Sequence, residues 1–279
     1  MGPLSEMGRF RGTATGRALV SGESRTVGIP TGALLAAPIE GGGDVRKALV
    51  GLSGAVVVIS ALAVASPAGA TSGQTIALWD MNEAPGSTVL IDSSANGFNG
   101  TIGSAVTPNG ASQFFDLRSH KSGTPVTPEH LDLVPDAPGL SPGTRDYSIT
   151  IRLRWAAALP DVNLVQKGQG SAHGWKVESA KGHVRCQFIG TSGQATVKST
   201  DFTSKTWADG NWHIVTCSRT ASAVTETIDG VLIGQTNHAT GDITNTWPIS
   251  IAGKTKCDNI TVWCDYWSGD IDYITITSP

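Results

Sequence analysis

Charged residues are scarce in this sequence, since Lys, Arg, Asp and Glu make up 15% of its 279 residues. That scarcity excludes a coiled coil and a charge-rich disordered tail. The net charge of −3 gives no basic field for nucleic acid. Only one long apolar run is present, at residues 48–65, which excludes a polytopic membrane protein. Gly is abundant instead, at 34 residues, and together with many Thr, Ser and Trp it favours an all-β extracellular protein.

The apolar run predicts a secretory signal peptide at residues 45–70. Arg46 and Lys47 precede it, and the small residues Ala68 and Ala70 follow it, the order in which a signal peptide is built. We expect cleavage after Ala70, secretion, and no membrane span in the mature chain. The alternative is an uncleaved anchor, because about 18 apolar residues can cross a bilayer.

Residues 1–44 have no periodic apolar pattern and are rich in Gly, Arg, Ser and Thr. Two interpretations are open: a misassigned start, with Val45 as the true initiator, or a disordered cytoplasmic extension. We favour the first, and in both cases residues 1–44 should not pack. Residues 71–279 remain as one domain that is long enough for a single core.

All four cysteines follow the predicted signal, as expected in an oxidising compartment. We predict the disulfides Cys186–Cys217 and Cys257–Cys264, the first because both residues lie in strand-like segments. One straight strand would hold Cys257 and Cys264 roughly 23 Å apart, beyond the reach of a disulfide, so the residues between them must loop back. A zinc site is the alternative, but no Cys-x-x-Cys occurs and His is scarce nearby.

Strict alternation of apolar and polar residues at 147–155 predicts a half-buried antiparallel strand. Similar patterns predict strands at 75–80, 183–189, 212–218 and 271–277, and a hairpin of 224–228 with 231–235 around Asp229-Gly230. Residues 103–142 are rich in turns, and we expect long loops around one or two strands there. No long stretch has a helical period, so the pattern indicates a two-sheet sandwich.

Several phrases of the sequence resemble the laminin-G-like, concanavalin A-like lectin/glucanase jelly-roll family. They are ALWDMNE at 77–83, IDSSANGFNGT at 91–101, the strand at 147–155, DGNWH at 209–213, TIDG at 227–230 and WSGDIDYI at 267–274. The family usually has Gly where this chain has Ala95. The match covers residues 75–277, and it implies an all-β, two-sheet antiparallel jelly-roll sandwich of the concanavalin A-like type.

The sequence lacks the acids of the superfamily's enzymes. Retaining glucanases carry Glu-x-Asp-x-x-Glu on one strand, which sets two carboxyls about 5 Å apart. After the signal the only glutamates are Glu83, Glu129, Glu178 and Glu226, and none lies in that pattern. We expect Glu226 to form a solvated pair with Asp229. Asp270 and Asp272 share a strand face but are a weak signal, so an enzyme is not expected.

The resemblance also implies calcium, which members of the family often hold near their opening loop. Asp92, Asn96 and the carbonyls of the Gly97 loop offer oxygens of the kind that calcium prefers, and Asp272 would come from the last strand. The alternative interpretation is an Asx turn at Asp92 and Asn96, with Asp272 simply on the surface.

A sugar site would need an aromatic platform beside amides and carboxylates. Of the eight Trp residues, Trp79, Trp155 and Trp212 lie in strand patterns and are expected in the core. We predict that Trp263, with its neighbours Asp258 and Asn259, binds the ligand, and that Trp175 is a further candidate. The predicted function is a secreted, noncatalytic carbohydrate-binding module for a polysaccharide or cell-surface glycan. The alternatives are a protein-interaction or adhesion module for a surface protein, or less favourably a glycoside hydrolase with unusual acids.

Overall fold

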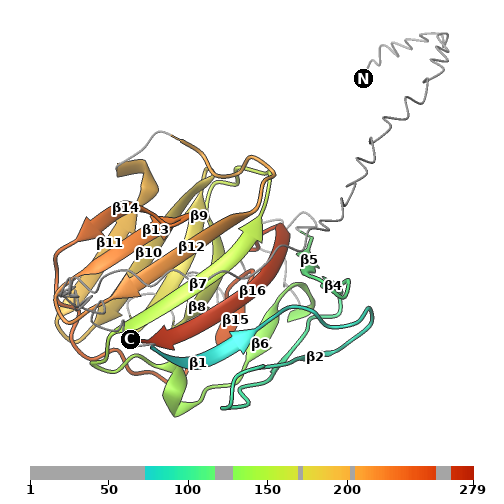
Figure 1. Cartoon of the computed structure of the whole chain (residues 1–279), viewed down its shortest axis with the longest axis horizontal. Coiled ribbons are helices and arrows are strands. Elements are labelled where there is room, and N and C mark those ends of the chain that lie inside the picture. Colours follow the sequence, from blue (N-terminus) through green and yellow to red (C-terminus); the bar gives the residue numbers. More distant parts are fainter. Residues whose placement is uncertain (1–72, 117–127, 169–171, 202–204, 256–264) are drawn as a thin grey trace, which may run out of the picture. The chain divides into compact units, whose positions relative to one another are not determined.

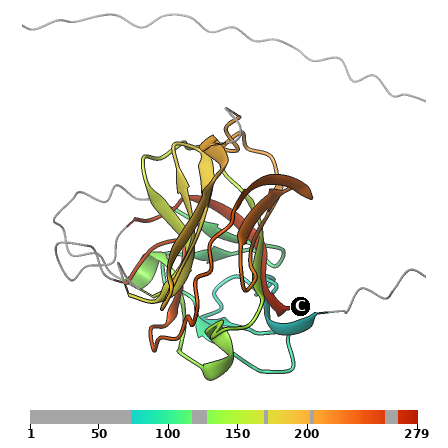
Figure 2. The same cartoon turned by 90° about the vertical axis from the view of Figure 1, so that its left-hand side faces the viewer.

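A computed structural model describes residues 73–116, 128–168, 172–201, 205–255 and 265–279. In these residues the chain forms two antiparallel sheets that pack face to face, joined by loops and short 3-10 turns (Figures 1 and 2). The predicted signal peptide at 45–70, the segment 1–44, and the predicted pair Cys257–Cys264 lie outside the described residues. In the described part of the chain, no helix has the length and apolar character needed to cross a bilayer.

The first sheet, sheet A, is built around the long last strand. Its spatial order is β14 (Val231–Thr236), β13 (Val224–Ile228), β12 (His213–Arg219), β7 (Tyr147–Arg154), β16 (Gly269–Ser278), β5 (Gln113–Phe115) and β4 (Thr107–Pro108). The opening strand β1 (Gln74–Trp79) also pairs with β16, along the part of that strand that β5 leaves free. All of these pairings are antiparallel.

The second sheet, sheet B, has the same number of strands. Its order is β11 (Gly193–Lys198), β10 (His183–Gly190), β9 (Gly174–Ala180), β8 (Val162–Lys167), β15 (Ile249–Ile251), β6 (Asp132–Val134), β3 (Gly100–Thr101) and β2 (Val89–Leu90). Three 3-10 turns connect strands: η1 (Pro128–His130), η2 (Pro138–Leu140) and η3 (Ser199–Asp201). The predicted two-sheet antiparallel sandwich is therefore confirmed.

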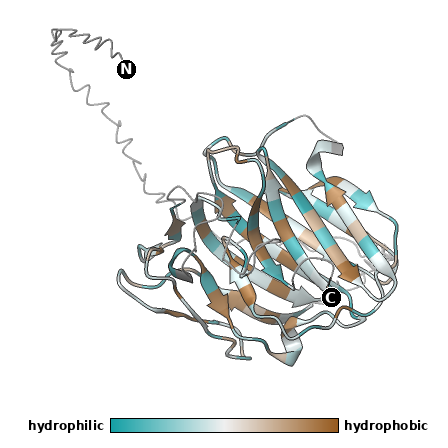
Figure 3. Ribbon diagram, turned by 180° about the vertical axis from the view of Figure 1, so that it is seen from behind, coloured by the Kyte–Doolittle hydropathy of each residue, from teal (hydrophilic) through white to brown (hydrophobic). Residues whose placement is uncertain are grey.

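Alternation along each strand divides the residues between the core and the surface, as the bands of colour in Figure 3 show. In β7 the side chains of Tyr147, Ile149, Ile151 and Leu153 are buried between the sheets, as the period of two predicts. The hairpin of β13 and β14 is also confirmed. Its turn residues Asp229 and Gly230 have φ of 53° and 76°, the left-handed pair that a two-residue hairpin requires.

The inner faces of the two sheets form one apolar core, which contains the predicted Trp79 and Trp155. The prediction that Trp212 is also in the core was wrong. Trp212 directly precedes His213, which points inward, so Trp212 points outward and lies half-exposed on sheet A. Its ring lies under the guanidinium groups of Arg152 and Arg154, at 4.6 and 4.9 Å from the ring centre.

The turn-rich segment at 103–142 contains more regular structure than expected. Instead of one or two strands, its described residues include the short strands β4, β5 and β6. Each has only two or three residues, too few to show a period of two. They exist because longer strands hold them: β5 pairs with the start of β16, and β6 pairs with β15.

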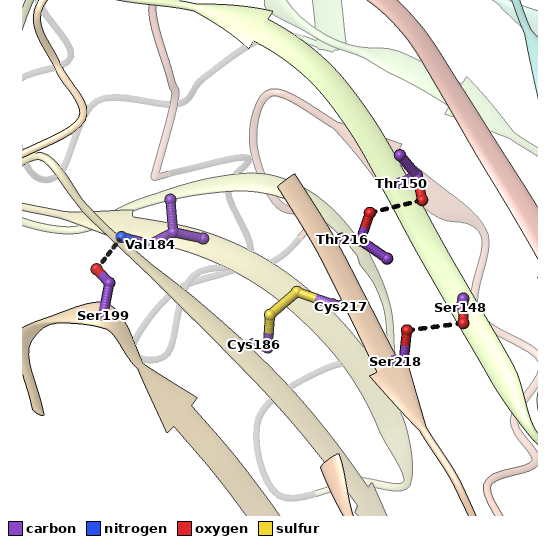
Figure 4. The surroundings of a disulfide bond; sticks show 8 residues. All are labelled: Ser148, Thr150, Val184, Cys186, Ser199, Thr216, Cys217 and Ser218. Atoms are coloured by element: carbon purple, nitrogen blue, oxygen red, sulfur yellow. Dashed lines mark hydrogen bonds between the residues drawn. A yellow bond between two sulfur atoms is a disulfide. The ribbon is translucent and has the colours of Figure 1, made fainter. Parts of the chain in front are cut away.

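The predicted disulfide Cys186–Cys217 is confirmed, with 5.6 Å between the two Cα atoms. It joins β10 of sheet B to β12 of sheet A across the core (Figure 4). On the opposite face of β12, hydroxyl side chains pair with those of β7, Ser148 with Ser218 at 2.8 Å and Thr150 with Thr216 at 2.9 Å. One strand is therefore cross-linked through its inner face and hydrogen-bonded through its outer face.

The fully buried ammonium group of Lys167 connects the end of β8 to two neighbouring loops. Lys167 ends β8, and its Nζ donates hydrogen bonds to Asp136 Oδ1 and to the backbone carbonyls of Asn245 and Trp247. Burial lowers the pKa of Lys167, although the hydrogen bond and the charge of Asp136 oppose the shift. The charge is retained inside the protein because these acceptors replace the water that the ammonium loses.

A second buried polar group, the carboxylate of Asp132, lies between the sheets with only part of its hydrogen-bonding capacity used. Asp132 accepts a hydrogen bond from Gly103 N–H at 3.2 Å, but its Oδ2 has no partner among the described residues. Gln113 donates to Glu83 at 2.8 Å, and within the described part of the chain its own Oε1 also lacks a partner. Burial raises the pKa of Asp132 well above its usual value, and the charge of Glu83 adds to the shift. A protonated Asp132 can donate a hydrogen bond that an ionised one cannot.

We predict that replacing both Cys186 and Cys217 with Ala lowers the free energy of unfolding by about 3–4 kcal/mol, because the unfolded chain regains the entropy of a large loop. The two cysteines are 31 residues apart. Urea unfolding of the oxidised wild type and the double variant measures the loss. The pair Cys257→Ala and Cys264→Ala is the comparison, since the predicted disulfide between these two residues would close a much shorter ring. Equal losses for the two pairs would contradict this prediction.

We also predict that Asp132→Asn becomes more stabilising, relative to the wild type, as the pH rises. Between the ordinary aspartate value of 3.8 and the raised pKa of the folded state, the folded protein binds more protons than the unfolded chain. The free energy of unfolding of the wild type therefore falls as pH rises through this window, and an amide has no such dependence. Urea unfolding across a pH series tests the sign.

Asp92→Asn is the opposite control, because the pKa of Asp92 is lowered in the folded protein. The ionised Asp92 carboxylate of the wild type stabilises the fold above the pKa that it has in the unfolded chain, and this stabilisation is lost as the pH falls. The cost of Asp92→Asn should accordingly shrink toward acidic pH. A pH-independent difference between Asp132→Asn and the wild type would show that Asp132 does not retain a proton in the fold.

Candidate functional site

The outer face of sheet B carries a polar groove over β8, β9 and β10. Because side chains alternate, Trp175, Val177, Cys186 and Phe188 fill the core from these strands, while the residues between them point outward. The groove encloses about 170 Å³. The polar side chains that line it come from these strands and from the loops beside them: Asp161, Gln166, Lys176, Glu178, Gln187, Lys254 and Asp265.

A chain of four alternating charges lies beside the groove. Lys176, Glu178 and Asp161 line it, and Arg185 links Glu178 to Asp161. Glu178 is only 2% exposed, and it accepts a hydrogen bond from Lys176 Nζ at 2.8 Å and forms an ion pair with Arg185. Arg185 in turn lies 3.5 Å from Asp161. The four charges sum to zero, so the groove is strongly polar but has little net attraction for an ion of either sign.

The pKa shifts follow from this arrangement. Burial alone would lower the pKa of Arg185, but the hydrogen bond and charge of Glu178, with the charge of Asp161, raise it. Burial also raises the pKa of Asp161, and the negative charge of Glu178 adds to that shift. Arg185 is thus held as a cation by the two acids on its sides.

The far wall of the groove is fixed by Asp265. Its carboxylate pairs with Lys254 at 2.5 Å and accepts a hydrogen bond from Asn163 Nδ2 at 3.2 Å. Its backbone carbonyl accepts from the Asn163 N–H at 2.9 Å. Lys254 and Asp265, which lie on either side of residues 256–264 in the sequence, both line the groove.

The predicted ligand-binding residues fall into two groups. Trp263, Asp258 and Asn259 lie outside the described residues. Trp175 belongs to β9 beside the groove, but its ring is on the core side: it is 2% exposed, packs against Tyr147 with 6.2 Å between ring centres, and donates from Nε1 to the Leu140 carbonyl. In this conformation the indole offers no open face to a sugar, because Lys176 takes the outward position.

The predicted calcium ligands are engaged in protein contacts. Asp92 accepts hydrogen bonds from the N–H groups of Leu78, Ser94 and Phe98, at 2.9, 2.9 and 2.7 Å. Burial would raise the pKa of Asp92, but these bonds more than offset it and the pKa is lowered. Asn96 donates to the Ile76 carbonyl at 2.8 Å. The carboxylate thus fastens its loop to β1.

The other predicted ligand, Asp272, lies on the outer face of sheet A, where it forms an ion pair with Arg152. Asp270 forms a similar pair with Arg154 at 3.0 Å. Alternation in the strand at 147–155 predicts both arginines on the outer face, but the sequence did not predict their pairing with the two aspartates. Within the described residues, no three His, Cys, Asp or Glu side chains are grouped closely enough to hold a metal ion.

One predicted pair of acids was wrong. Glu226 does not pair with Asp229 in solvent, because it is fully buried on the inner face of β13. Asp229 instead contacts His213 Nδ1 at 2.8 Å, and Asp209 contacts Nε2 of the same ring at 3.0 Å. A hydrogen bond from Asn211 N–H and the contact with His213 lower the pKa of Asp209 to about 2. In the DGNWH phrase, His213 is therefore held between two aspartates at the start of β12.

Comparison with known proteins gives the fold and no family. No family model matches the chain, and no curated protein matches it significantly. The chain is similar in structure to the binding domain of Paraclostridial Mosquitocidal Protein 1, with a TM-score of 0.53 and 15% identity over 73% of this chain and 48% of that one. Membership of the laminin-G-like family stays a prediction.

Two further solved structures are similar to this chain to the same degree. One is the botulinum neurotoxin serotype D ligand-binding domain in complex with N-acetylneuraminic acid (TM-score 0.51, 12% identity, 73% of this chain and 47% of that one). The other is the binding domain of botulinum neurotoxin DC in complex with rat synaptotagmin II (TM-score 0.52, 12% identity, 73% and 48%). This chain spans about half the length of each of the three, and the likeness is one of β-sandwich fold alone.

We predict that Arg185→Ala lowers the free energy of unfolding by about 2 kcal/mol, because it removes a cation from the buried Glu178 carboxylate. Urea unfolding at neutral pH measures the change. Lys198→Ala is the matched control, since Lys198 is an exposed cation paired in register with Arg185 on the neighbouring strand. A similar loss for both variants would mean that the charge chain does not hold the groove together.

Proposed function

We propose that this protein is a secreted, noncatalytic carbohydrate-binding module, and that its glycan binds in the groove on sheet B. The observation that supports this most is the fixed chain of Lys176, Glu178, Arg185 and Asp161. It sums to zero charge and presents alternating donors and acceptors. Sugar hydroxyls both donate and accept hydrogen bonds, so a neutral glycan can pair with such a row without bringing a counter-charge.

The small volume of the groove limits what it can take. About 170 Å³ is below the roughly 300–1,000 Å³ of pockets for drug-sized ligands. It therefore suits one sugar ring or the edge of a longer chain. The amides of Gln166 and Gln187 add neutral donors and acceptors beside the charged row.

A stacking surface is the remaining requirement of the proposal, and we assign it to Trp263. Lys254 and Asp265 both line the groove, and Trp263 is the aromatic residue of the sequence between them. Asp258 and Asn259 would supply further hydrogen bonds. An indole is well suited to this role because it offers a large apolar face and a polar N–H.

Hydrolysis is disfavoured by the contacts of the acids. A retaining glycosidase needs a nucleophilic carboxylate and an acid that donates a proton, about 5 Å apart. In the groove, Glu178 is held by two cations. Elsewhere, Glu83 accepts hydrogen bonds from Ile91 N–H and Gln113. Neither glutamate is placed as a free acid.

A protein partner is the second candidate. The edge strand β14 exposes Val231 and Leu232 by 62% and 60%, with Ile214 nearby on the hairpin side of β12. Exposed apolar side chains grouped at a sheet edge are typical of interaction surfaces. The fold is compatible with both kinds of ligand, since one similar structure is titled as a complex with a sugar and another as a complex with a protein.

We predict that the purified mature chain binds neutral oligosaccharides on a glycan array, and that Trp263→Ala weakens the binding at least about tenfold through loss of the stacking surface. Gln187→Ala should weaken it several-fold. Ile91→Ala is the control, because Ile91 is exposed on sheet B's far edge and outside the groove. The second candidate would be favoured if no glycan on the array bound and if the chain instead bound a surface protein through Val231 and Leu232.

The same measurement, repeated with a chelator, tests calcium. A calcium ion bound by Asp92 would have to replace the hydrogen bonds that the carboxylate now accepts from three backbone N–H groups. Weaker glycan binding after chelation would support a functional ion in this loop. Unchanged binding and unchanged thermal stability would argue against it.

A further inference from the structure

A second hollow lies away from the groove, where the β4–β5 hairpin meets the loop before it and η1. Its volume is about 410 Å³. Six described residues line it: Ala105, Thr107, Phe114, Asp116, Glu129 and His130. None of them lines the groove on sheet B. The two hollows are therefore independent, and either can be changed without touching the other.

The wall of this hollow contains an exposed aromatic ring. In β5, Gln113 and Phe115 point into the core, so Phe114 between them points outward and is 38% exposed. Phe114 stands opposite Thr107 on β4 and opposite Asp270 on β16. Asp270 is paired with Arg154, so this neighbouring ion pair adds no net charge beside the ring. An exposed phenyl face costs stability in water and suits a ligand that covers it.

The charge inside the hollow is negative. Glu129 is exposed in η1, and its charge acts on the neighbouring Tyr266, because burial and the charge of Glu129 together raise the pKa of Tyr266. Tyr266 packs against His130 with 5.4 Å between ring centres. Among the described lining residues there is no Lys or Arg. The hollow thus combines an aromatic face with the carboxylates of Asp116 and Glu129, and among its described lining residues Glu129 has no cationic side chain beside it.

We propose that this hollow binds an amino sugar. The apolar face of the sugar ring covers Phe114, the protonated amine pairs with Glu129, and Thr107 and His130 bond the ring hydroxyls. An ammonium gains both from the carboxylate and from the electron-rich face of a nearby ring. A neutral sugar would leave the Glu129 charge without a partner, and an acidic sugar would be repelled by it. This site extends beyond the proposed function, because it uses other residues and another charge.

The test is titration of the full mature chain with a glucosamine trisaccharide, with binding read from the NMR shifts of the β4–β5 residues, which line this hollow and not the groove. Every affinity below is the one that these shifts report. Binding is expected for the wild type. Phe114→Ala and Glu129→Gln should each weaken it by about tenfold. N-acetylation of the trisaccharide removes the ammonium and should weaken binding to a similar extent, and high salt should weaken it further.

Two controls separate this site from the groove. Ile91→Ala removes an exposed apolar side chain elsewhere on the surface and should leave the affinity unchanged. Gln187→Ala changes the groove and should also leave it unchanged, so failure of the groove proposal would not affect this measurement. The proposal is overturned if Phe114→Ala binds as tightly as the wild type, if the acetylated sugar binds equally well, or if no binding is detected. Tighter binding of a trilysine peptide than of the amino sugar would also overturn it, by showing a site for peptides.

Discussion

The packing of two inner sheet faces against each other is the constraint on which the rest of the structure depends. Each strand must place its apolar residues on one face, and this requirement decides the orientation of every other side chain. Trp175 and Phe188 enter the core, so their neighbours Lys176 and Gln187 must face outward. The groove on sheet B is in this sense the reverse side of the core. The disulfide Cys186–Cys217 crosses the same core and fixes the two faces to each other.

Buried polar groups show how tightly this constraint operates. Lys167 is tolerated inside because Asp136 and two backbone carbonyls accept hydrogen bonds from its ammonium group. Asp132 and Gln113 enter the core from opposite sheets, and each has an acceptor oxygen without a partner among the described residues; burial raises the pKa of Asp132. Glu178 lies on the outer side of sheet B, and there two cations, rather than apolar atoms, cover its carboxylate. Charge is thus tolerated where partners are built in.

The sequence was sufficient for features that depend on local pattern. The strand at 147–155, the hairpin around Asp229-Gly230 and the pair Cys186–Cys217 could be predicted, because alternation and turn residues are visible within a few positions. The short strands β4, β5 and β6 could not, since they are defined only by their distant partners. Trp212 was misplaced because a residue at a strand end has no pattern on one side to set its parity. The groove joins residues about a hundred positions apart, such as Asn163 and Asp265, and no local signal brings them together.

The pairing of β1 with β16 has a consequence for how the chain reaches its native state. Thr275 of the last strand hydrogen-bonds to Ala77 of the first, 198 residues earlier. Sheet A therefore cannot be completed during synthesis until the final strand has emerged, and long-range closure of this kind slows folding. Until then the opening strand has an unpaired edge, and a nascent chain in that condition is a substrate for chaperones. The same delay keeps the first and last strands of sheet A apart in the growing polypeptide until their pairing can form.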